Sequence, residues 1–175
     1  MFRIKAKKAL LCIGSNIDDR TFYISEAIKK LDEFLTIEKI SSIYESMSLK
    51  KDSQKDYYNV VIKVETCYKP AELLKNIKAI EVLLGRVKRE KWGEREIDID
   101  IIDYNGIVFN RDGLTIPHYD MHNRSFVLYP LLEVEPDYIH PVLQKNVKDM
   151  INELTDRLNI KKIGGIKNGS YNHIT

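Results

Sequence analysis

Two aspartates lie one residue apart in the stretch EREIDIDII, which runs from Glu94 to Ile102. The isoleucines around them predict a strand, in which alternate side chains point to opposite faces of a sheet. Asp98 and Asp100 would then share one face, with Cα atoms about 7 Å apart, while Ile97, Ile99 and Ile101 face a core. Two carboxylates so placed repel each other, and Mg²⁺ is often held by one or two carboxylates together with substrate phosphates. The pair therefore indicates either a magnesium site or two solvated charges on an exposed face.

The segment just before this strand, GRVKREKWGER, is rich in cations and carries the only tryptophan, Trp92. Cations beside a pair of carboxylates suit a polyphosphate ligand, whereas the ordinary interpretation of such a run is a solvated loop. An exposed tryptophan is unusual in a plain loop, which favours the first interpretation. The basic residues of the segment are Arg86, Lys88, Arg89, Lys91 and Arg95.

The segment after the strand, PHYDMHNR, offers four more polar or aromatic groups within seven residues: His118, Tyr119, His122 and Arg124. A single histidine is more often structural than functional, so His122 carries little weight. The sequence contains no glycine-rich phosphate-binding loop of the Walker type. A bound nucleotide would therefore be held by side chains and metal ions.

The elements that must position these residues follow from periodicity. Alternating or continuous apolar runs predict strands at 9–13, 37–44, 58–64 and 97–104, and apolar residues at helical spacing predict helices at 19–34 and 70–85. Asn105-Gly106 predicts a hairpin that returns through 107–109. Further helices are expected around 126–134 and 147–158. The order predicts an α+β ferredoxin-like sandwich, an antiparallel sheet with helices on one face, followed by a C-terminal helical extension.

Composition sets the bounds on class. The 175 residues, 43% hydrophobic, fit a single domain spanning 1–175, with a loosely held tail at 159–175. A net charge of +2 gives no support for nucleic-acid binding, and no apolar run is long enough for a membrane span. The basic start has too short an apolar part for a signal peptide, and Cys12 and Cys67 have no metal-ligand or disulfide spacing. We expect a cytoplasmic monomer.

The motif RxxDxDI, preceded by GR and WG and followed by LTIPHYDMHNRSFVLYPLLEVEP, resembles the 6-hydroxymethyl-7,8-dihydropterin pyrophosphokinases of folate biosynthesis. LLCIGSNI near the start and DYYNVVIKVET in the middle resemble the same family, so that the likeness covers about residues 8–145. The resemblance implies a ferredoxin-like core, transfer of a pyrophosphoryl group from MgATP to the pterin hydroxymethyl group, release of AMP, and two Mg²⁺ ions.

The resemblance also assigns roles to individual residues. It implies that Asp98 and Asp100 bind both metal ions, that Asp98 also contacts the pterin, and that Arg95, Lys91 and Trp92 take part in catalysis. The positions that match ATP-binding residues are Lys78, Glu81, Lys88, Arg95, Ile101, Thr115, His118, Tyr119 and Arg124. The positions that match pterin-binding residues are Ser46, Leu49, Tyr57, Asn59, Trp92, Asp98 and Phe126. Lys78, Lys88 and Lys91 depart from the family, which often has glutamine at the first position and arginine at the other two.

Some of these roles also make chemical sense from the residues alone. Asn59 alternates with Val60 and Ile62, so it can point to the same face as the aspartates. An amide offers both a donor and an acceptor to a heterocycle with a mixed polar edge, and aromatic rings can sandwich that heterocycle. The alternative is that Tyr57 and Phe126 are ordinary core aromatics and that Asn59 is merely a polar strand residue.

Two other classes of function remain open at the level of sequence. A two-metal nuclease or phosphatase would also use neighbouring aspartates, but it would need further carboxylate or histidine ligands, and candidates are few. A ferredoxin-like RNA-binding domain would display aromatics within a glycine-rich strand motif, which this sequence lacks. Incubation with MgATP and the pterin, followed by a search for AMP, distinguishes the three classes.

Overall fold

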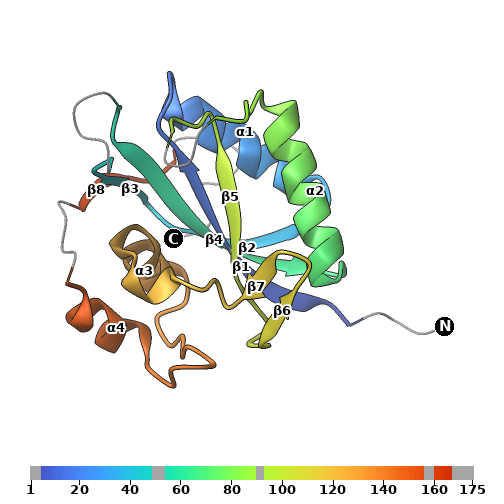
Figure 1. Cartoon of the computed structure of the whole chain (residues 1–175), viewed down its shortest axis with the longest axis vertical. Coiled ribbons are helices and arrows are strands. Elements are labelled where there is room, and N and C mark those ends of the chain that lie inside the picture. Colours follow the sequence, from blue (N-terminus) through green and yellow to red (C-terminus); the bar gives the residue numbers. More distant parts are fainter. Residues whose placement is uncertain (1–4, 49–53, 90–92, 156–159, 167–175) are drawn as a thin grey trace.

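The computed structural model describes residues 5–48, 54–89, 93–155 and 160–166. The main sheet has the strand order β5-β1-β4-β3-β8, with β2 also paired to β4, and every pairing is antiparallel. Its strands are β1 (Lys7–Ser15), β2 (Thr36–Ile40), β3 (Ile43–Ser46), β4 (Tyr57–Thr66), β5 (Asp98–Tyr104) and β8 (Lys161–Gly164), and a separate hairpin consists of β6 (Phe109–Arg111) and β7 (Leu114–Ile116). The helices are α1 (Arg20–Asp32), α2 (Pro70–Leu83), α3 (Ser125–Val134) and α4 (Val147–Glu153), with a 3₁₀ turn η1 (Met121–Asn123) before α3 (Figure 1).

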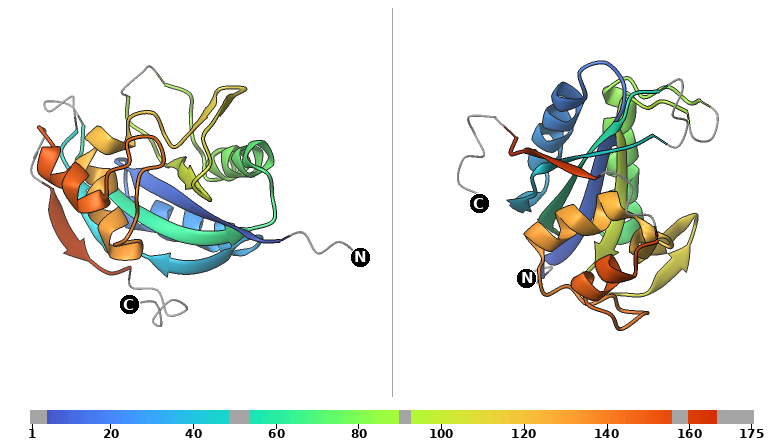
Figure 2. Two further views of the ribbon diagram at one scale, coloured as in Figure 1. Left: turned by 90° about the horizontal axis from the view of Figure 1, so that it is seen from below. Right: turned by 90° about the vertical axis from the view of Figure 1, so that its left-hand side faces the viewer.

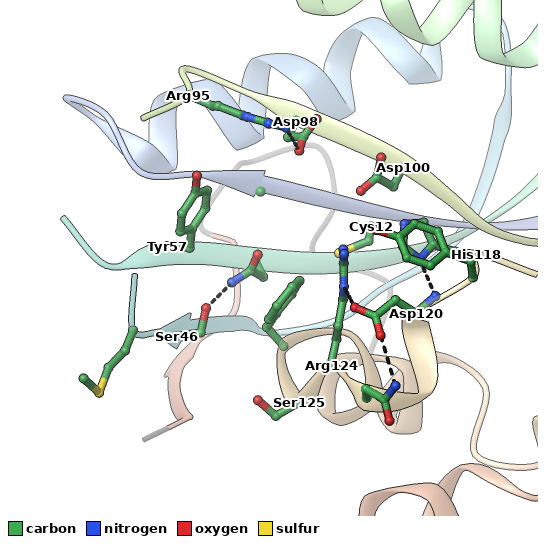
Figure 3. Close-up of a pocket in the computed structure, with 16 residues that line it drawn as sticks. Cys12, Ser46, Tyr57, Arg95, Asp98, Asp100, His118, Asp120, Arg124 and Ser125 are labelled. Carbon is green, nitrogen blue, oxygen red and sulfur yellow. Dashed lines mark hydrogen bonds and ion pairs between the residues drawn. The ribbon is translucent and has the colours of Figure 1, made fainter. Parts of the chain in front are cut away.

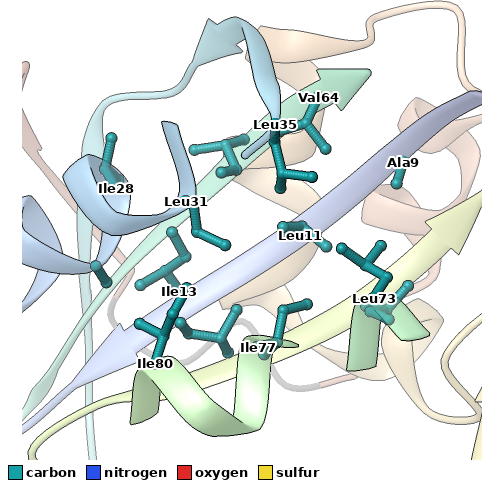
Figure 4. Close-up of a cluster of buried hydrophobic side chains, with 14 of the residues drawn as sticks. Ala9, Leu11, Ile13, Ile28, Leu31, Leu35, Val64, Leu73, Ile77 and Ile80 are labelled. Atoms are coloured by element: carbon teal, nitrogen blue, oxygen red, sulfur yellow. The ribbon is translucent and has the colours of Figure 1, made fainter. Parts of the chain in front are cut away.

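One face of the sheet is covered by α1 and α2, and this is where the larger core lies (Figure 4). Alternate residues of the central strands point into it, Leu11 and Ile13 from β1 and Ile99 from β5 among them, all fully buried. Ile24, Ile28 and Leu31 recur at helical spacing along α1 and bury its apolar stripe. The alternation in the sequence is therefore the direct cause of this layer.

The opposite face is covered over part of its area by α3 and α4, which form the predicted C-terminal helical extension; the sequence did not place this extension relative to the sheet (Figure 2). The second core lies here, where Leu10, Val61 and Ile102 of the sheet meet Leu128 and Leu131 of α3. The helices of this extension have apolar faces that must pack against another apolar surface. The face of the sheet that α1 and α2 do not cover provides that surface.

The predicted strand at 37–44 is two strands. β2 and β3 both pair with β4, and Ser41 and Ser42 separate them. The Ser41 hydroxyl accepts a hydrogen bond from the Val61 peptide N–H at 3.0 Å, and its own N–H donates to the Val61 carbonyl at 2.9 Å. The side chain thus takes over ladder bonds at the break, which lets the chain shift register without leaving buried peptide groups unpaired.

The hairpin predicted at Asn105-Gly106 is also wrong, although a tight turn does occur there. Both residues have positive φ, 52° and 67°, as the dipeptide favours. Residues 107–108 do not return along β5, however, and a second turn with positive φ at Asp112 and Gly113 forms the hairpin β6-β7. It is the segment after this hairpin that meets β5, through the His118 N–H to the Ile102 carbonyl at 3.0 Å.

The end of the chain differs from expectation at two points. The helix predicted to reach Leu158 ends earlier, with Leu154 as its C-cap. The tail predicted to be loosely held contains β8, which pairs with β3 at the edge of the sheet. Its sequence, KKIG, has no apolar alternation, so pattern alone gives no sign of a strand. Within the described parts of the chain, no helix combines the length and the apolar character that a membrane span requires.

Candidate active site

A cavity of about 420 Å³ opens on the sheet face that α3 and α4 only partly cover. Its floor is formed by one end of β1, β4 and β5, and one wall is formed by the segment that leads through η1 into α3 (Figure 3). Its lining residues are Cys12, Gly14, Ser46, Met47, Tyr57, Asn59, Arg95, Asp98, Asp100, His118, Tyr119, Asp120, Asn123, Arg124, Ser125 and Phe126. The cavity therefore brings together residues from both sides of the aspartate motif.

Strand alternation explains why the floor is polar. Asp98 and Asp100 point into the cavity while Ile99 points into the opposite core, as predicted (Figure 3). Gly14 of β1 lies between Asn59 of β4 and Asp98 of β5, since its Cα is partnered with both of theirs. A Cβ at position 14 would stand 3.0 Å from the Asn59 Oδ1 atom, so a larger residue here would require the Asn59 amide to shift.

The two carboxylates differ in their partners. Asp98 forms ion pairs with Arg95 at 2.6 Å and with Arg86 at 2.8 Å. Among the described residues, none forms a hydrogen bond or an ion pair with the Asp100 carboxylate, and burial, followed by the charge of Asp98, raises the pKa of Asp100. Lys78, His118 and Arg124 oppose this rise only from a distance, and a cation bound to the carboxylate would stabilise its charged form directly.

Arg95 is held from the turn that follows β1. The fully buried Asn16 accepts a hydrogen bond from the Arg95 peptide N–H at 2.8 Å through its Oδ1 atom, and its own peptide N–H donates to the Arg95 carbonyl at 3.2 Å. Asn16, directly after β1, therefore fixes the backbone from which the Arg95 guanidinium group reaches Asp98.

The opposite wall carries a second set of charges. Asp120 accepts hydrogen bonds from Arg124 Nε at 3.0 Å and from the Asn123 amide at 3.0 Å. Burial alone would raise the pKa of Asp120, but these bonds outweigh it and lower that pKa. Burial lowers the pKa of His118, although the charge of Asp100 opposes the effect, so that the imidazole is favoured in its neutral form. The Arg124 guanidinium group lies 5.6 Å from the centroid of the Phe126 ring.

The remaining end of the cavity is built for a flat polar ligand. Asn59 is buried, and its amide donates to the Ser46 hydroxyl at 2.9 Å. The Tyr57 hydroxyl donates to the Gly93 carbonyl at 3.3 Å, which orients its ring along the cavity (Figure 3). Phe126, at the start of α3, lines the same space. An amide and two aromatic rings thus face one volume, as the sequence predicts.

Several residues predicted to bind ATP do not line this cavity: Lys78, Glu81, Lys88, Ile101 and Thr115. The side chain of Glu81 is only 2% exposed, and its Oε1 atom accepts from the Ile99 peptide N–H at 2.7 Å and from Lys78 at 2.9 Å. Burial raises the pKa of Glu81, and the nearby cations oppose this. Ile101 points into the core beneath α1 and α2.

Thr115 and Lys88 lie elsewhere still. Thr115 is on the β6-β7 hairpin, where its hydroxyl group donates to Asn110 at 3.3 Å. Lys88 lines a smaller cleft of about 330 Å³ together with Val82, Arg86, Val87, Arg89 and Arg95. Arg95 lines both the cleft and the main cavity, so the two spaces adjoin. The predicted positions Leu49, Lys91 and Trp92 lie outside the described residues.

Some lining residues were not predicted from the sequence: Cys12, Gly14, Met47, Asp120, Asn123 and Ser125. Strand alternation could have identified Cys12 and Gly14, since they occupy the β1 face that is not apolar core. Arg86 pairs with Asp98, but the sequence distinguishes it only as one of several loop cations. Asp120 and Asn123 line the cavity because of the way the chain folds around η1, and no sequence pattern predicts this position.

The pocket combines two carboxylates, guanidinium groups from two elements and an aromatic end, and it therefore defines an enzyme that transfers phosphoryl groups. The family model for 7,8-dihydro-6-hydroxymethylpterin-pyrophosphokinase matches residues 10–136. The chain belongs to this family. It is an ATP-dependent pyrophosphokinase of folate biosynthesis, and the resemblance seen in the sequence is confirmed.

Relatives agree with this placement. The chain is 48% identical over 145 residues to the 2-amino-4-hydroxy-6-hydroxymethyldihydropteridine pyrophosphokinase of Aquifex aeolicus, covering 83% of this chain and 91% of the relative. It is 37% identical over 155 residues to the enzyme of the same name from Haemophilus influenzae, covering 87% and 96%. A Plasmodium falciparum HPPK-DHPS crystal structure aligns with a TM-score of 0.65 at 19% identity, over 85% of this chain and 41% of that longer one. This likeness confirms the ferredoxin-like fold.

Proposed function

We propose that the main cavity is where this chain transfers the pyrophosphoryl group of ATP to the hydroxymethyl group of 6-hydroxymethyl-7,8-dihydropterin. Family membership supports the reaction. The observation that supports the location is the placement of Asp98 and Asp100 in one cavity with Asn59 and Phe126, so that the anionic and the aromatic ends share one volume. The oxygen of the hydroxymethyl group would lie where these two ends meet.

The aspartate pair fits the hard divalent cations that accompany ATP. No described residue forms a hydrogen bond or an ion pair with the Asp100 carboxylate, and no group of three or more candidate ligands occurs in those parts of the chain. Further ligands would therefore come from phosphate oxygens and water, which is the usual manner of binding Mg²⁺. We propose that Asp98 and Asp100 hold two Mg²⁺ ions with ATP. When bound, these ions would neutralise phosphate charge and stabilise the leaving group.

The guanidinium groups supply the remaining positive charge. Arg86 and Arg95 both pair with Asp98, and Arg124 faces the cavity from the other wall. Guanidinium groups bind phosphate oxygens bidentately, so these side chains suit the two sides of a triphosphate. In the reaction the hydroxymethyl oxygen forms a bond to the β-phosphorus of ATP. The bond between that phosphorus and the oxygen that bridges it to the α-phosphorus breaks, and AMP leaves with this oxygen. The hydroxyl proton passes to solvent. Orientation of the two substrates is the main contribution of the chain.

The pterin would occupy the other end. Asn59 has an amide oxygen and a second N–H available to pair with a heterocycle, since one N–H is bonded to Ser46. Tyr57 and Phe126 provide aromatic surfaces from β4 and from α3. Because these groups lie on two different elements, the width of the slot depends on how α3 packs against the sheet.

Separation of nucleotides after incubation with ATP, Mg²⁺ and the dihydropterin tests the proposal. We expect AMP to form only when the pterin is present, and the pterin to become its pyrophosphate. Predominant ADP would indicate a simple kinase, and pterin-independent hydrolysis would indicate a phosphatase. Either of these results contradicts the proposal.

We further propose that the chain acts as a monomer in a reducing compartment such as the cytoplasm. Residues of a single chain line the cavity from every described side, and Cys12 and Cys67 are both free thiols. Light scattering at assay concentration tests the first point, and we expect a mass near 20.4 kDa. Fractionation of cells that express the protein tests the second.

A further inference from the structure

Glu133 lies near the end of α3 and joins three segments of the chain. Its carboxylate accepts hydrogen bonds from the Ser42 peptide N–H at 2.6 Å and from the Tyr44 hydroxyl group at 2.8 Å, and it forms an ion pair with Lys162 at 2.6 Å. Ser42 directly precedes β3, Tyr44 lies within it, and Lys162 lies on β8. One side chain therefore joins α3 to β3 and β8, the two strands at this side of the sheet.

The bonds to Glu133 are those of a charged carboxylate. Its side chain is 26% exposed, and burial by itself would raise its pKa. The bonds from Lys162, Ser42 and Tyr44 outweigh burial and lower the pKa of Glu133. Hydrogen bonds to an ionised acceptor are stronger than neutral ones, so this junction is firm at neutral pH.

Both joined elements reach the cavity at their other ends. α3 begins at Ser125 and Phe126, which line the cavity, and about 10 Å of helix separates Phe126 from Glu133. β3 ends at Ser46, which also lines the cavity and accepts the hydrogen bond from Asn59. Glu133 itself does not line the cavity.

We propose that Glu133 is a positioning residue that sets the separation between the Phe126 wall and the Ser46–Asn59 wall, and thereby the affinity of the pterin slot. The inference rests on the proposed function, since it takes the slot to be the pterin site. If α3 pivots or shifts when the junction is lost, the change at Phe126 widens the slot. The phosphate end should change less, because Arg124 is held separately by Asp120.

Glu135 offers a matched control. It follows Glu133 by two residues, it caps the end of α3, and it forms an ion pair with Lys63 of β4. Lys63 has a second acidic neighbour, Glu38 at 3.9 Å, and β4 is held along its whole length by β1. Loss of Glu135 therefore removes an ion pair at the same helix end without releasing β3.

The experiment measures four variants, Glu133→Gln, Glu133→Ala, Tyr44→Phe and Glu135→Gln, beside the wild-type chain. The readouts are KM for each substrate, kcat, the dissociation constant of 6-hydroxymethylpterin from its own fluorescence, and the melting temperature. We expect Glu133→Gln to raise the pterin KM and dissociation constant about tenfold, a loss of about 1.4 kcal/mol of binding, with the ATP KM changed less than about twofold. Tyr44→Phe should change pterin binding in the same direction by about two- to threefold, and Glu135→Gln should leave it unchanged.

The outcomes separate the two proposals. If the wild type forms pterin-dependent AMP but Glu133→Gln lowers the melting temperature without weakening pterin binding, the residue is a structural link only and the inference is wrong. Equal weakening by Glu135→Gln also overturns it. If the Glu133 variants do not fold, Tyr44→Phe with unaltered pterin binding has the same meaning. If the wild type neither binds pterin nor forms AMP, the proposed function fails, and the inference fails with it.

Discussion

The two faces of the main sheet are built from the same strands, but one face is hydrophobic core and the other is partly core and partly cavity. On the face under α1 and α2, residues such as Leu11, Ile62 and Ile99 are fully buried along the strands. On the other face the strands begin in the same way, with Leu10, Val61 and Ile102 packed beneath α3 and α4. Toward one end, however, they change to a polar set.

The polar set consists of Gly14, Asn59, Asp98 and Asp100. Each lies two or four residues along its strand from an apolar residue of the second core, and therefore on the same face of the sheet. One face of one sheet thus passes from core to cavity without any change in backbone structure. The comparison teaches that the stability of the sheet and the chemistry of the cavity rest on alternate residues of the same strands. Substitutions on the two faces should therefore affect activity and stability separately.

The largest effect is expected at Asp100. Asp100→Asn should lower kcat/KM at least about 10³-fold, or about 4 kcal/mol, because it removes a charge at the phosphate end of the cavity. The unfolding free energy should be unchanged or slightly higher, since a like charge beside Asp98 is removed. Pterin-dependent AMP formation at saturating Mg²⁺ and urea denaturation measure the two quantities. Near-normal turnover would refute the role assigned to the pair.

Ile99, between the two aspartates, should show the converse. Ile99→Ala removes a fully buried side chain from the core under α1 and α2 and should lower the unfolding free energy by about 2–5 kcal/mol. The KM values of the folded protein should remain near those of the wild type, because no cavity group changes. Urea denaturation with parallel kinetics at low temperature tests this. A marked rise in either KM without loss of stability would show that the two faces are not separable.

Gly14 tests the boundary between core and cavity. In Gly14→Ala the added Cβ would meet the Asn59 Oδ1 atom at 3.0 Å, so the amide must move. We expect the pterin KM to rise about tenfold, which corresponds to about 1.4 kcal/mol, with little change in the ATP KM. Stability should change by less than about 1 kcal/mol, as is usual where no core volume is lost. An unchanged pterin KM would mean that Asn59 does not contact the pterin.

The smallest effect concerns the loop that leads into β5. Glu96 accepts two hydrogen bonds from Arg89, at 2.6 and 2.8 Å, and these bonds, against the opposing effect of burial, lower its pKa to about 2. A depressed folded-state pKa stabilises the fold above the unfolded value near 4.5, and this contribution is lost as pH falls toward 2. Glu96→Gln should thus be less stable than the wild type at pH 7. Denaturation from pH 7 to pH 2 should show the difference shrinking below about pH 5.

A pH-independent difference would contradict the expectation for Glu96. Arg89→Gln provides the matched variant, since it removes the same two bonds from the other side. It should show the same loss of stability at neutral pH, and the same convergence with the wild type in acid.

Alternation accounts for what the sequence could predict. Ile97, Ile99 and Ile101 against Asp98 and Asp100 placed the carboxylates on the correct face, and the same rule placed Asn59 beside them. Local chemistry also predicted the turn at Asn105-Gly106. The hairpin forms instead at a second turn, Asp112-Gly113. The sequence pattern alone does not show which of the two turns, Asn105-Gly106 or Asp112-Gly113, joins paired strands.

Features that depend on tertiary partners could not be predicted. β8 has a polar sequence and becomes a strand because the edge of β3 and the carboxylate of Glu133 receive it. The break at Ser41 is stabilised by Val61, 20 residues away. Likewise, the family resemblance assigns Glu81 to ATP binding, but its contact with the Ile99 N–H requires α2 to pack against β5.

β8 and Glu81 lie at opposite edges of the main sheet, and their contacts there should affect how the protein behaves at high concentration. The outer strand of a sheet offers unpaired peptide groups to neighbouring molecules, and such edges promote association into larger aggregates. Here β8 covers part of β3 on one side, and at the other side Lys78 and Glu81 engage the peptide groups of Ile99 while His118 engages Ile102. A chain shortened before Lys161 would expose the edge of β3 next to the cavity. Its first defect should then be self-association, visible as turbidity on concentration at temperatures where the core remains intact.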